Sequence, residues 1–203
     1  MNLALFYDTE TTGLPLFKEP SNDPRQPHIV QLGAILVDLD TRKTISALDV
    51  IVKPAGWTIP DDIAAIHGIT TDYAADTGIP EPMAVEMLLK MYEQAGFRVA
   101  HNESFDCRIV RIACKRFFGD DCADKWKTGA ANCTAVLSTP IMKLPPTEKM
   151  LAVGRKHPKT PTLAEAYSFF TGRELENAHS AMADTLACRD VYFAILDRNG
   201  GAV

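Results

Sequence analysis

Apolar residues recur along the chain with two different periods, which predict an alternation of strands and helices. Short apolar runs at 3–7 and 97–100 are typical of buried strands, as are longer runs of β-branched and aliphatic residues at 28–38 and 44–52. The polar link at 39–43 predicts that the two long runs pair as an antiparallel hairpin.

Apolar residues at helical spacing and helix-capping residues predict the helical part of the fold. Thr162 and Glu165 have the form of a capping box, in which each side chain satisfies a backbone N–H at the helix start. Helices are expected over 61–66, 81–95, 104–117, 162 to about 170, and about 180 to 198. From 119 to 161 the pattern is weaker, and no element is assigned there.

These elements predict an α/β fold in which a mixed β-sheet is flanked by α-helices. The hairpin is antiparallel, whereas the strand at 97–100 arrives through a helical crossover. No repeat or clear linker divides the chain, so a single domain over residues 1–203 is expected. Two irregular segments interrupt it: 15–27 contains four prolines, and 143–159 carries five Lys/Arg and one Glu.

The composition narrows the functional class. The chain has 203 residues, is 46% hydrophobic and 23% charged, and carries a net charge of −5. This acidity argues against extended binding to nucleic-acid backbone or to anionic membrane, which needs a basic face. No apolar run approaches the ~20 residues of a membrane span, and the N-terminus lacks the basic start of a secretory signal. A cytoplasmic protein is therefore expected.

Two carboxylates follow the first predicted strand, in the sequence FYDTETTGL. Residues two apart on a strand point the same way, so Asp8 and Glu10 project together while Thr9 points elsewhere. Two like charges so close repel each other, and the flanking sequence offers no basic partner. A divalent cation would resolve the conflict, because hard cations prefer carboxylate oxygen. The alternative is a pair of solvated acids at a strand end.

Two further polar clusters lie where helices begin. His101-Asn102-Glu103-Ser104-Phe105-Asp106 follows the strand at 97–100, at the kind of strand end where α/β proteins bind ligands. Alone, Asp106 could be an acid favoured by the helix dipole, and Asn102 a helix cap. In the third cluster, Ser180 is the expected N-cap of the last helix, with His179 on the preceding loop and Asp184 in the second turn.

In combination, the three clusters have the order D-x-E, H-N-x-x-F-D and H-x(4)-D. This order closely resembles the exonuclease motifs of the DnaQ-like 3′–5′ exonuclease family, DEDDh type, over residues 3 to about 197. The stretch IHGIT at 66–70 is also similar to that family. The resemblance implies an RNase H-like fold, a mixed sheet flanked by helices, which agrees with the predicted elements.

The resemblance also implies the chemistry of the site. Asp8, Glu10, Asp106 and Asp184 would hold two divalent ions, Mg²⁺ or Mn²⁺, and His179 would be the general base that takes a proton from water. Two ions can clamp the attacking and leaving oxygens of a phosphodiester. Histidine titrates near pH 6.5, which suits a base working at neutral pH. Activity is then expected to rise with pH through that titration and level off.

Substrate contacts follow from the same resemblance, residue by residue. Thr11 and Leu14 would line the pocket for the terminal nucleotide, with Leu14 against the base. His67 and Phe105 would complete this pocket, and Asn102 would contact sugar or phosphate. For Leu14 and Phe105 the alternative is packing in the core. The segment at 143–159 would lie along the strand backbone or form a solvated loop, and the segment at 15–27 would form a flap.

The sequence thus predicts a metal-dependent 3′–5′ exonuclease that releases nucleoside 5′-monophosphates, with single-stranded DNA as the expected substrate. An exoribonuclease acting on short RNA or RNA 3′ ends is the alternative, since the same residues serve both reactions. A catalytically silent nucleic-acid-binding module is a third, weaker hypothesis, because no acid and no histidine of the set is missing. A transient association with replication or repair machinery is compatible with the first.

Overall fold

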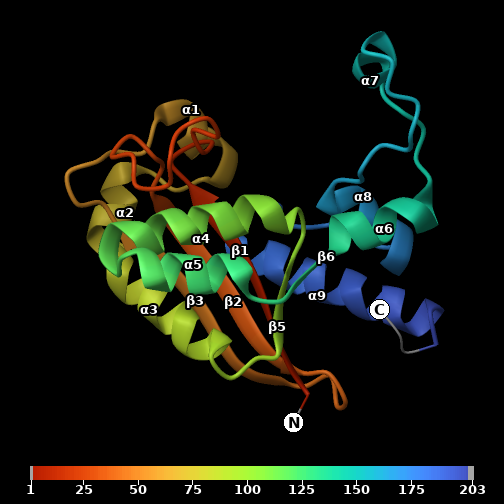
Figure 1. The fold of residues 1–203 in the computed structure, drawn as a ribbon, viewed down its shortest axis with the longest axis horizontal. Coiled ribbons are helices and arrows are strands. Elements are labelled where there is room, and N and C mark those ends of the chain that lie inside the picture. The colour runs from red at the N-terminus through yellow and green to blue at the C-terminus, as the bar shows by residue number, and fades with distance from the viewer. Residues whose placement is uncertain (1, 201–203) are drawn as a thin grey trace.

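The computed structural model describes residues 2–200, and within them six strands form one mixed sheet (Figure 1). The strand order is β4-β3-β2-β1-β5-β6. β1 pairs antiparallel with β2 and parallel with β5, so the sheet changes direction beside β1. The strands are β1 (Leu3–Thr11), β2 (Ile29–Asp38), β3 (Thr44–Lys53), β4 (Ile79–Pro80), β5 (Phe97–Ala100) and β6 (Ala131–Cys133).

Helices cover both faces of this sheet. α3 (Glu81–Tyr92), α4 (Glu103–Phe117) and α5 (Asp120–Thr128) pack on one face, against side chains that include Leu5 and Tyr7 of β1. α9 (Ala181–Arg198) packs on the opposite face, against Ala4 and Phe6. Alternate residues of β1 therefore belong to different cores, as the period of a strand requires. Every residue of β2, the strand beside it, is buried.

The α/β fold, the hairpin and the helical crossover to β5 are confirmed. The capping box at Thr162 and Glu165 is present at the start of α8 (Leu163–Thr171). The first strand was predicted too short, because it continues beyond residue 7 to Thr11. The acid pair therefore lies within the paired strand, and the helix predicted over 81–95 ends at Tyr92.

The weakly patterned region from 119 to 161 contains regular structure that the sequence did not reveal. α5, β6, α6 (Thr134–Met142) and the short α7 (Glu148–Ala152) all lie there. α2 (Thr71–Thr77) and β4 were missed as well, although α1 (Asp61–His67) was predicted. These elements are short, and β6 and β4 hold their places through backbone pairing with β5 and β3 rather than through a periodic apolar pattern.

The proline-rich segment between β1 and β2 is an ordered loop. Gln26, only 2% exposed, accepts a hydrogen bond from the Leu16 N–H and donates to the carbonyls of Leu16 and Pro20. Arg108 of α4 donates to the carbonyl of Glu19. Because these bonds satisfy backbone groups across the loop, prolines and polar residues can hold one shape without regular secondary structure.

No helix among residues 2–200 is both long and apolar enough to cross a membrane.

Candidate functional site

The site is built around the end of β1, where consecutive side chains face different helices. Asp8 and Glu10 follow Ala4 and Phe6 in register, and so project on the side covered by α9. Thr9 projects toward α4 and is buried. The strand thereby presents two carboxylates to one helix and a hydroxyl to another.

Thr9 fixes the third carboxylate. Its backbone N–H and its hydroxyl both donate to Oδ1 of Asp106, at 3.0 and 2.8 Å. Asp106, 2% exposed, lies in the first turn of α4, directly beyond the end of β5. Asn102, the residue that caps this helix, has a left-handed backbone with φ of 63°, and its side chain makes no capping hydrogen bond. The chain thus turns sharply between β5 and α4.

A close contact between α9 and β2 brings in the fourth carboxylate. A Cβ on Gly33 would lie 2.5 Å from the backbone of Ala181, so only glycine fits between strand and helix. The Gln31 side chain accepts a hydrogen bond from the Ala181 N–H at 3.0 Å, and the Thr185 hydroxyl donates to the Gly33 carbonyl. Asp184 lies in the first turn of α9, not the second as predicted, and this turn is the part held against the sheet.

His179 stands just before α9 at the exposed rim of the site. Its nitrogen, one carboxylate oxygen of Glu10 and one of Asp184 all lie within 4.8 Å of one another. Its backbone has a φ of 67°, and its N–H donates to Oδ2 of Asp184 at 3.2 Å. A left-handed histidine costs backbone free energy, and such conformations concentrate at functional sites.

The pKa values of all four carboxyl groups are raised, and burial is the largest cause in each. Burial, and then the charges of Asp106, Asp184 and Glu10, raise the pKa of Asp8 well above its usual range. Burial, and then the charges of Asp184 and Asp106, raise the pKa of Glu10 to about 8. Burial raises the pKa of Asp106 to about 7, although the two hydrogen bonds from Thr9 lower it. The charged forms of these acids are therefore disfavoured unless a cation lies beside them.

The donor set fits a divalent cation. Within residues 2–200 no Lys or Arg forms an ion pair with any of the four acids, although ion pairs are frequent elsewhere in the fold. Oδ1 of Asp184 is buried and has no hydrogen-bond partner among the described residues. A buried carboxylate oxygen without a partner is costly. Carboxylate oxygens of Glu10 and Asp184 within 4.8 Å of each other, with Asp8 and Asp106 as acidic neighbours, are the type of ligand that Mg²⁺ and Mn²⁺ prefer.

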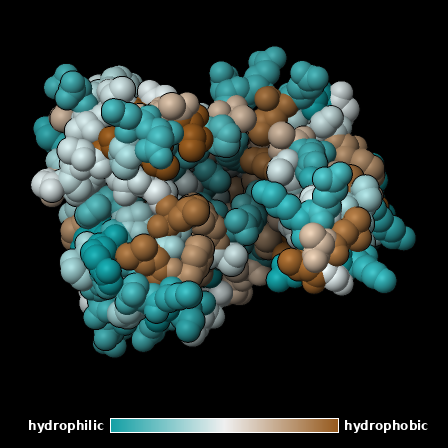
Figure 2. Space-filling view, turned by 90° about the horizontal axis from the view of Figure 1, so that it is seen from above, coloured by the Kyte–Doolittle hydropathy of each residue, from teal (hydrophilic) through white to brown (hydrophobic). Residues whose placement is uncertain are grey.

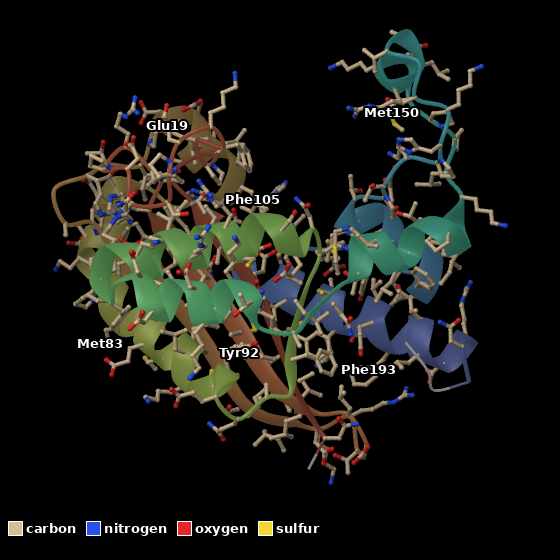
Figure 3. All side chains as sticks on the ribbon, viewed as in Figure 1. Glu19, Met83, Tyr92, Phe105, Met150 and Phe193 are labelled. Carbon is tan, nitrogen blue, oxygen red and sulfur yellow. The ribbon has the colours of Figure 1, made fainter. Side chains whose placement is uncertain are left out.

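The residues predicted to bind the substrate differ in their exposure and in their contacts. Leu14 is 75% exposed beyond the end of β1, so it is not a core residue. Phe105 is half-buried against the core, and Figure 3 shows it on the upper side of α4, the side that faces the loop bearing Glu19. His67 ends α1, accepts a hydrogen bond from the Ile69 N–H, and keeps a buried Nε2 without a partner among the described residues.

Thr11 and Asn102 have local structural tasks. The Thr11 hydroxyl donates to the carbonyl of Gly13 and accepts from its N–H, which forms the turn after β1. Asn102 caps α4 by position, and its side chain accepts only a long hydrogen bond from Ser104 at 3.5 Å. The Asn102 side chain is therefore the freer of the two to meet a ligand, and both assignments stay predictions.

Three positioning residues escaped the sequence analysis: Thr9, Gln31 and Gly33. Two of them carried a signal, because a polar residue and a glycine interrupt the otherwise apolar run IVQLGAILVD. A glycine inside a buried strand often marks the close approach of another backbone. Thr9 carried none, since its partner, Asp106, is 97 residues away.

From above, the surface is hollowed between two lobes (Figure 2). The larger lobe contains the loop after β1 together with α1, and the smaller one contains α6 and α8 with the segment between them (Figure 1). β1 points its carboxyl end, the part of the strand that bears Asp8 and Glu10, toward this side of the molecule (Figure 1).

The family model RNase_T, described as an exonuclease, matches residues 5–192. No curated protein sequence gives a match.

Solved structures with the same fold include exonuclease I of E. coli. Its zinc ion-bound complex with single-stranded DNA has a TM-score of 0.73 at 22% identity, and the match covers 98% of this chain and 42% of that one. Its complex with a dA16 oligonucleotide gives 0.73 at 21% identity, with the same coverage. Exonuclease I from Methylocaldum szegediense gives 0.72 at 22% identity, covering 98% and 41%. The chain thus spans about two fifths of the length of these proteins.

Proposed function

Because this chain belongs to the RNase_T exonuclease family, we propose that it is a metal-dependent 3′–5′ exonuclease acting on single-stranded DNA. The observation that carries the proposal is the convergence of Asp8, Glu10, Asp106 and Asp184, partly or wholly buried and without a basic partner among residues 2–200, beside the exposed His179. The products are nucleoside 5′-monophosphates and a strand that is one nucleotide shorter.

The four carboxylates would hold two divalent ions, Mg²⁺ or Mn²⁺. When bound, such ions supply Lewis-acid stabilisation to the attacking and the leaving oxygen of a phosphodiester. Two observations support this assignment. A cation would be a partner for Oδ1 of Asp184, which has none among the described residues. A cation would also favour the charged form of Glu10, whose pKa is raised in its absence. Both hydrogen bonds from Thr9 go to Oδ1 of Asp106, so neither of them occupies Oδ2.

His179 would act as the general base. A water oxygen would attack the phosphorus of the last phosphodiester while His179 takes the proton that the water loses. The bond from phosphorus to the 3′ oxygen breaks, and that oxygen takes a proton from solvent to become the new 3′-hydroxyl. Its position on the exposed loop, next to Glu10 and Asp184, lets it reach a water at the carboxylates from the solvent side. The hydrogen bond from its backbone N–H to Asp184 holds the loop in place without using the imidazole.

A single DNA strand is the proposed substrate. The solved structures with this fold that hold oligonucleotides are exonuclease I complexes with single-stranded DNA. The exposed Leu14 would meet the terminal base, and Phe105, His67, Thr11 and Asn102 would complete the pocket. The sequence arguments place the protein in the cytoplasm as one domain, with replication or repair machinery as a transient partner.

The decisive experiment uses a 5′-labelled single-stranded DNA of about 20 nucleotides with Mg²⁺. We expect a ladder of shortened products, and its loss by about 10²-fold or more in Asp8→Asn, which keeps the shape of the side chain and removes its charge. Asp121→Asn, an exposed acid on α5, is the matched control. Equal ladders from the parent and Asp8→Asn would reject the proposal.

The same assay separates the competing hypotheses. Duplex DNA, a 3′-mismatched duplex and an RNA of the same sequence are compared at equal enzyme concentration. Faster shortening of the RNA would favour an exoribonuclease, whereas binding of DNA in Mg²⁺ without cleavage between pH 6 and 9 would favour a silent binding module.

A further inference from the structure

A basic arm projects from the body of the molecule beside the site. We define it as residues 143–160, which leave α6, form α7 at the tip and return to α8. Building on the proposed function, we propose that this arm is a second nucleic-acid contact, which binds backbone phosphates of the strand upstream of its 3′-terminal nucleotide.

The arm is a two-legged projection with almost all of its residues exposed. Its legs are joined near the base, where the Lys159 N–H donates to the carbonyl of Leu144 at 3.1 Å. At the tip, Thr147 caps α7 by accepting a hydrogen bond from the Met150 N–H. Figure 1 shows the arm rising beyond the rest of the fold, and Figure 3 shows Met150 near its end.

The arm concentrates positive charge on an acidic protein. Its five basic residues and one Glu give it a net charge of +4, so the rest of the chain carries −9 against a total of −5. Lys159 is held by Glu165 of α8 at 2.6 Å. The other four cations are exposed, and within residues 2–200 none of them forms an ion pair: Lys143, Lys149, Arg155 and Lys156.

A half-buried histidine contacts the chain just beyond the end of the arm. His101 lies between β5 and α4, five residues before Asp106. Its Nε2 contacts the carbonyl of Pro161 at 3.0 Å and its Nδ1 contacts the Thr134 hydroxyl at 2.9 Å. A carbonyl only accepts, so Nε2 carries the hydrogen and Nδ1 accepts from Thr134. The end of the arm is therefore anchored to the segment between β5 and α4 that leads into Asp106.

This placement favours nucleic acid as the ligand of the arm. A strand whose 3′ end lies at the carboxylates leaves them through the space between the two lobes, one of which bears the arm (Figure 2). Whenever the site carboxylates are not neutralised by bound ions, they repel the phosphates of the strand. Exposed Lys and Arg side chains on the arm attract the phosphates and offset that repulsion. Flexible basic side chains without paired acids suit phosphates, whose contacts carry no sequence information.

The experiment compares the parent with two triple variants. The arm variant is Lys149→Gln, Arg155→Gln and Lys156→Gln, and the control is Lys90→Gln, Lys125→Gln and Lys127→Gln, three cations on the more distant α3 and α5. Binding of a fluorescent 20-nucleotide DNA is measured in EDTA, without cleavage, from 50 to 200 mM salt. Each phosphate contact to a single strand contributes about −0.7 to the slope of log K against log salt.

We expect the arm variant to bind about tenfold more weakly and to lose about 2 from the magnitude of that slope, with the control unchanged. With Mg²⁺, KM for the 20-mer rises while kcat stays constant, and a dinucleotide too short to reach the arm is hydrolysed equally by all three proteins. Equal slopes for the parent and the arm variant would overturn the inference, even if the parent is active.

Two other outcomes are informative. Absence of cleavage by the parent would reject the proposed function, whereas the salt slopes measured in EDTA would still test the arm. A ten-residue poly-glutamate peptide tests the alternative of an acidic protein partner. Tighter binding of this peptide than of the DNA at the same salt, lost in the arm variant, would overturn the nucleic-acid assignment.

Discussion

Single residues decide what the carboxylate site can hold. Asp8 and Glu10 are placed together by strand alternation, but their repulsion becomes large only because Asp106 and Asp184 join them in a partly desolvated space. The acids and His179 were predicted as a set from the resemblance of their three motifs to a known exonuclease family. Thr9 was not, because its importance lies in the two hydrogen bonds it gives to a residue that is distant in the chain.

The first prediction concerns His179. His179→Ala is expected to lower kcat by about 10²–10⁴-fold, the usual contribution of a positioned base. The side chain is exposed, so the melting temperature should change little. Activity is measured across a Mg²⁺ titration, with Glu86→Ala, an exposed side chain on α3, as control.

The titration separates two roles for this side chain. If His179 is a base, the Mg²⁺ concentration for half-maximal activity stays constant while kcat falls. If it is instead a metal ligand, which its distance from Glu10 and Asp184 also allows, that concentration rises. Near-parental rates at neutral pH would contradict both roles.

At the scale of elements, the site depends on where two helices begin. α4 and α9 each follow a residue with a left-handed backbone, Asn102 and His179. The first turns of these helices carry Asp106 and Asp184 toward β1. The sequence predicted both helices closely, whereas their distance from the sheet depends on the hydrogen bonds and close packing of β1 and β2.

The second prediction tests that packing. Gly33→Ala would place a Cβ 2.5 Å from the Ala181 backbone, so α9 must move away from β2. We expect a loss of about 1–3 kcal/mol in the free energy of unfolding. A shift of about 1 Å in Asp184 would also lower kcat by roughly 10²-fold.

Gly96→Ala is the matched control, because a Cβ there meets nothing closer than 3.7 Å. Unfolding is followed by denaturant titration, and activity is measured well below the transition. Full activity in Gly33→Ala would show that the close contact does not position Asp184.

For the whole molecule, the buried carboxyl groups of the site make stability depend on pH, and on bound ions if the proposed metal site is correct. Glu10 has its pKa raised from 4.5 to about 8 by burial and by its acidic neighbours. The folded form thus keeps a proton that the unfolded form releases between these values. Stability contributed by this proton is fully present below pH 4.5 and is lost as the pH rises toward 8.

The third prediction follows from this sign. In EDTA, the melting temperature should fall as the pH rises from 5 to 8, and Glu10→Gln should flatten that dependence. Glu86→Gln, an exposed acid on α3, should not. Mg²⁺ at about 100 times its Kd adds about 2.7 kcal/mol, or roughly 5–10 °C, with a larger gain at pH 8. A melting temperature indifferent to Mg²⁺ at pH 8 would contradict a metal site.

The sequence by itself determined the α/β class and the long strands and helices, and it named the acids and the histidine as candidates. These features are local, because periodicity, capping and motif spacing lie within short stretches of chain. The tertiary structure decided the rest: the hydrogen bonds from Thr9 to Asp106, the contact at Gly33 and the contact of His101 just beyond the end of the basic arm. Each depends on residues distant in sequence meeting at atomic separation, which no local pattern encodes.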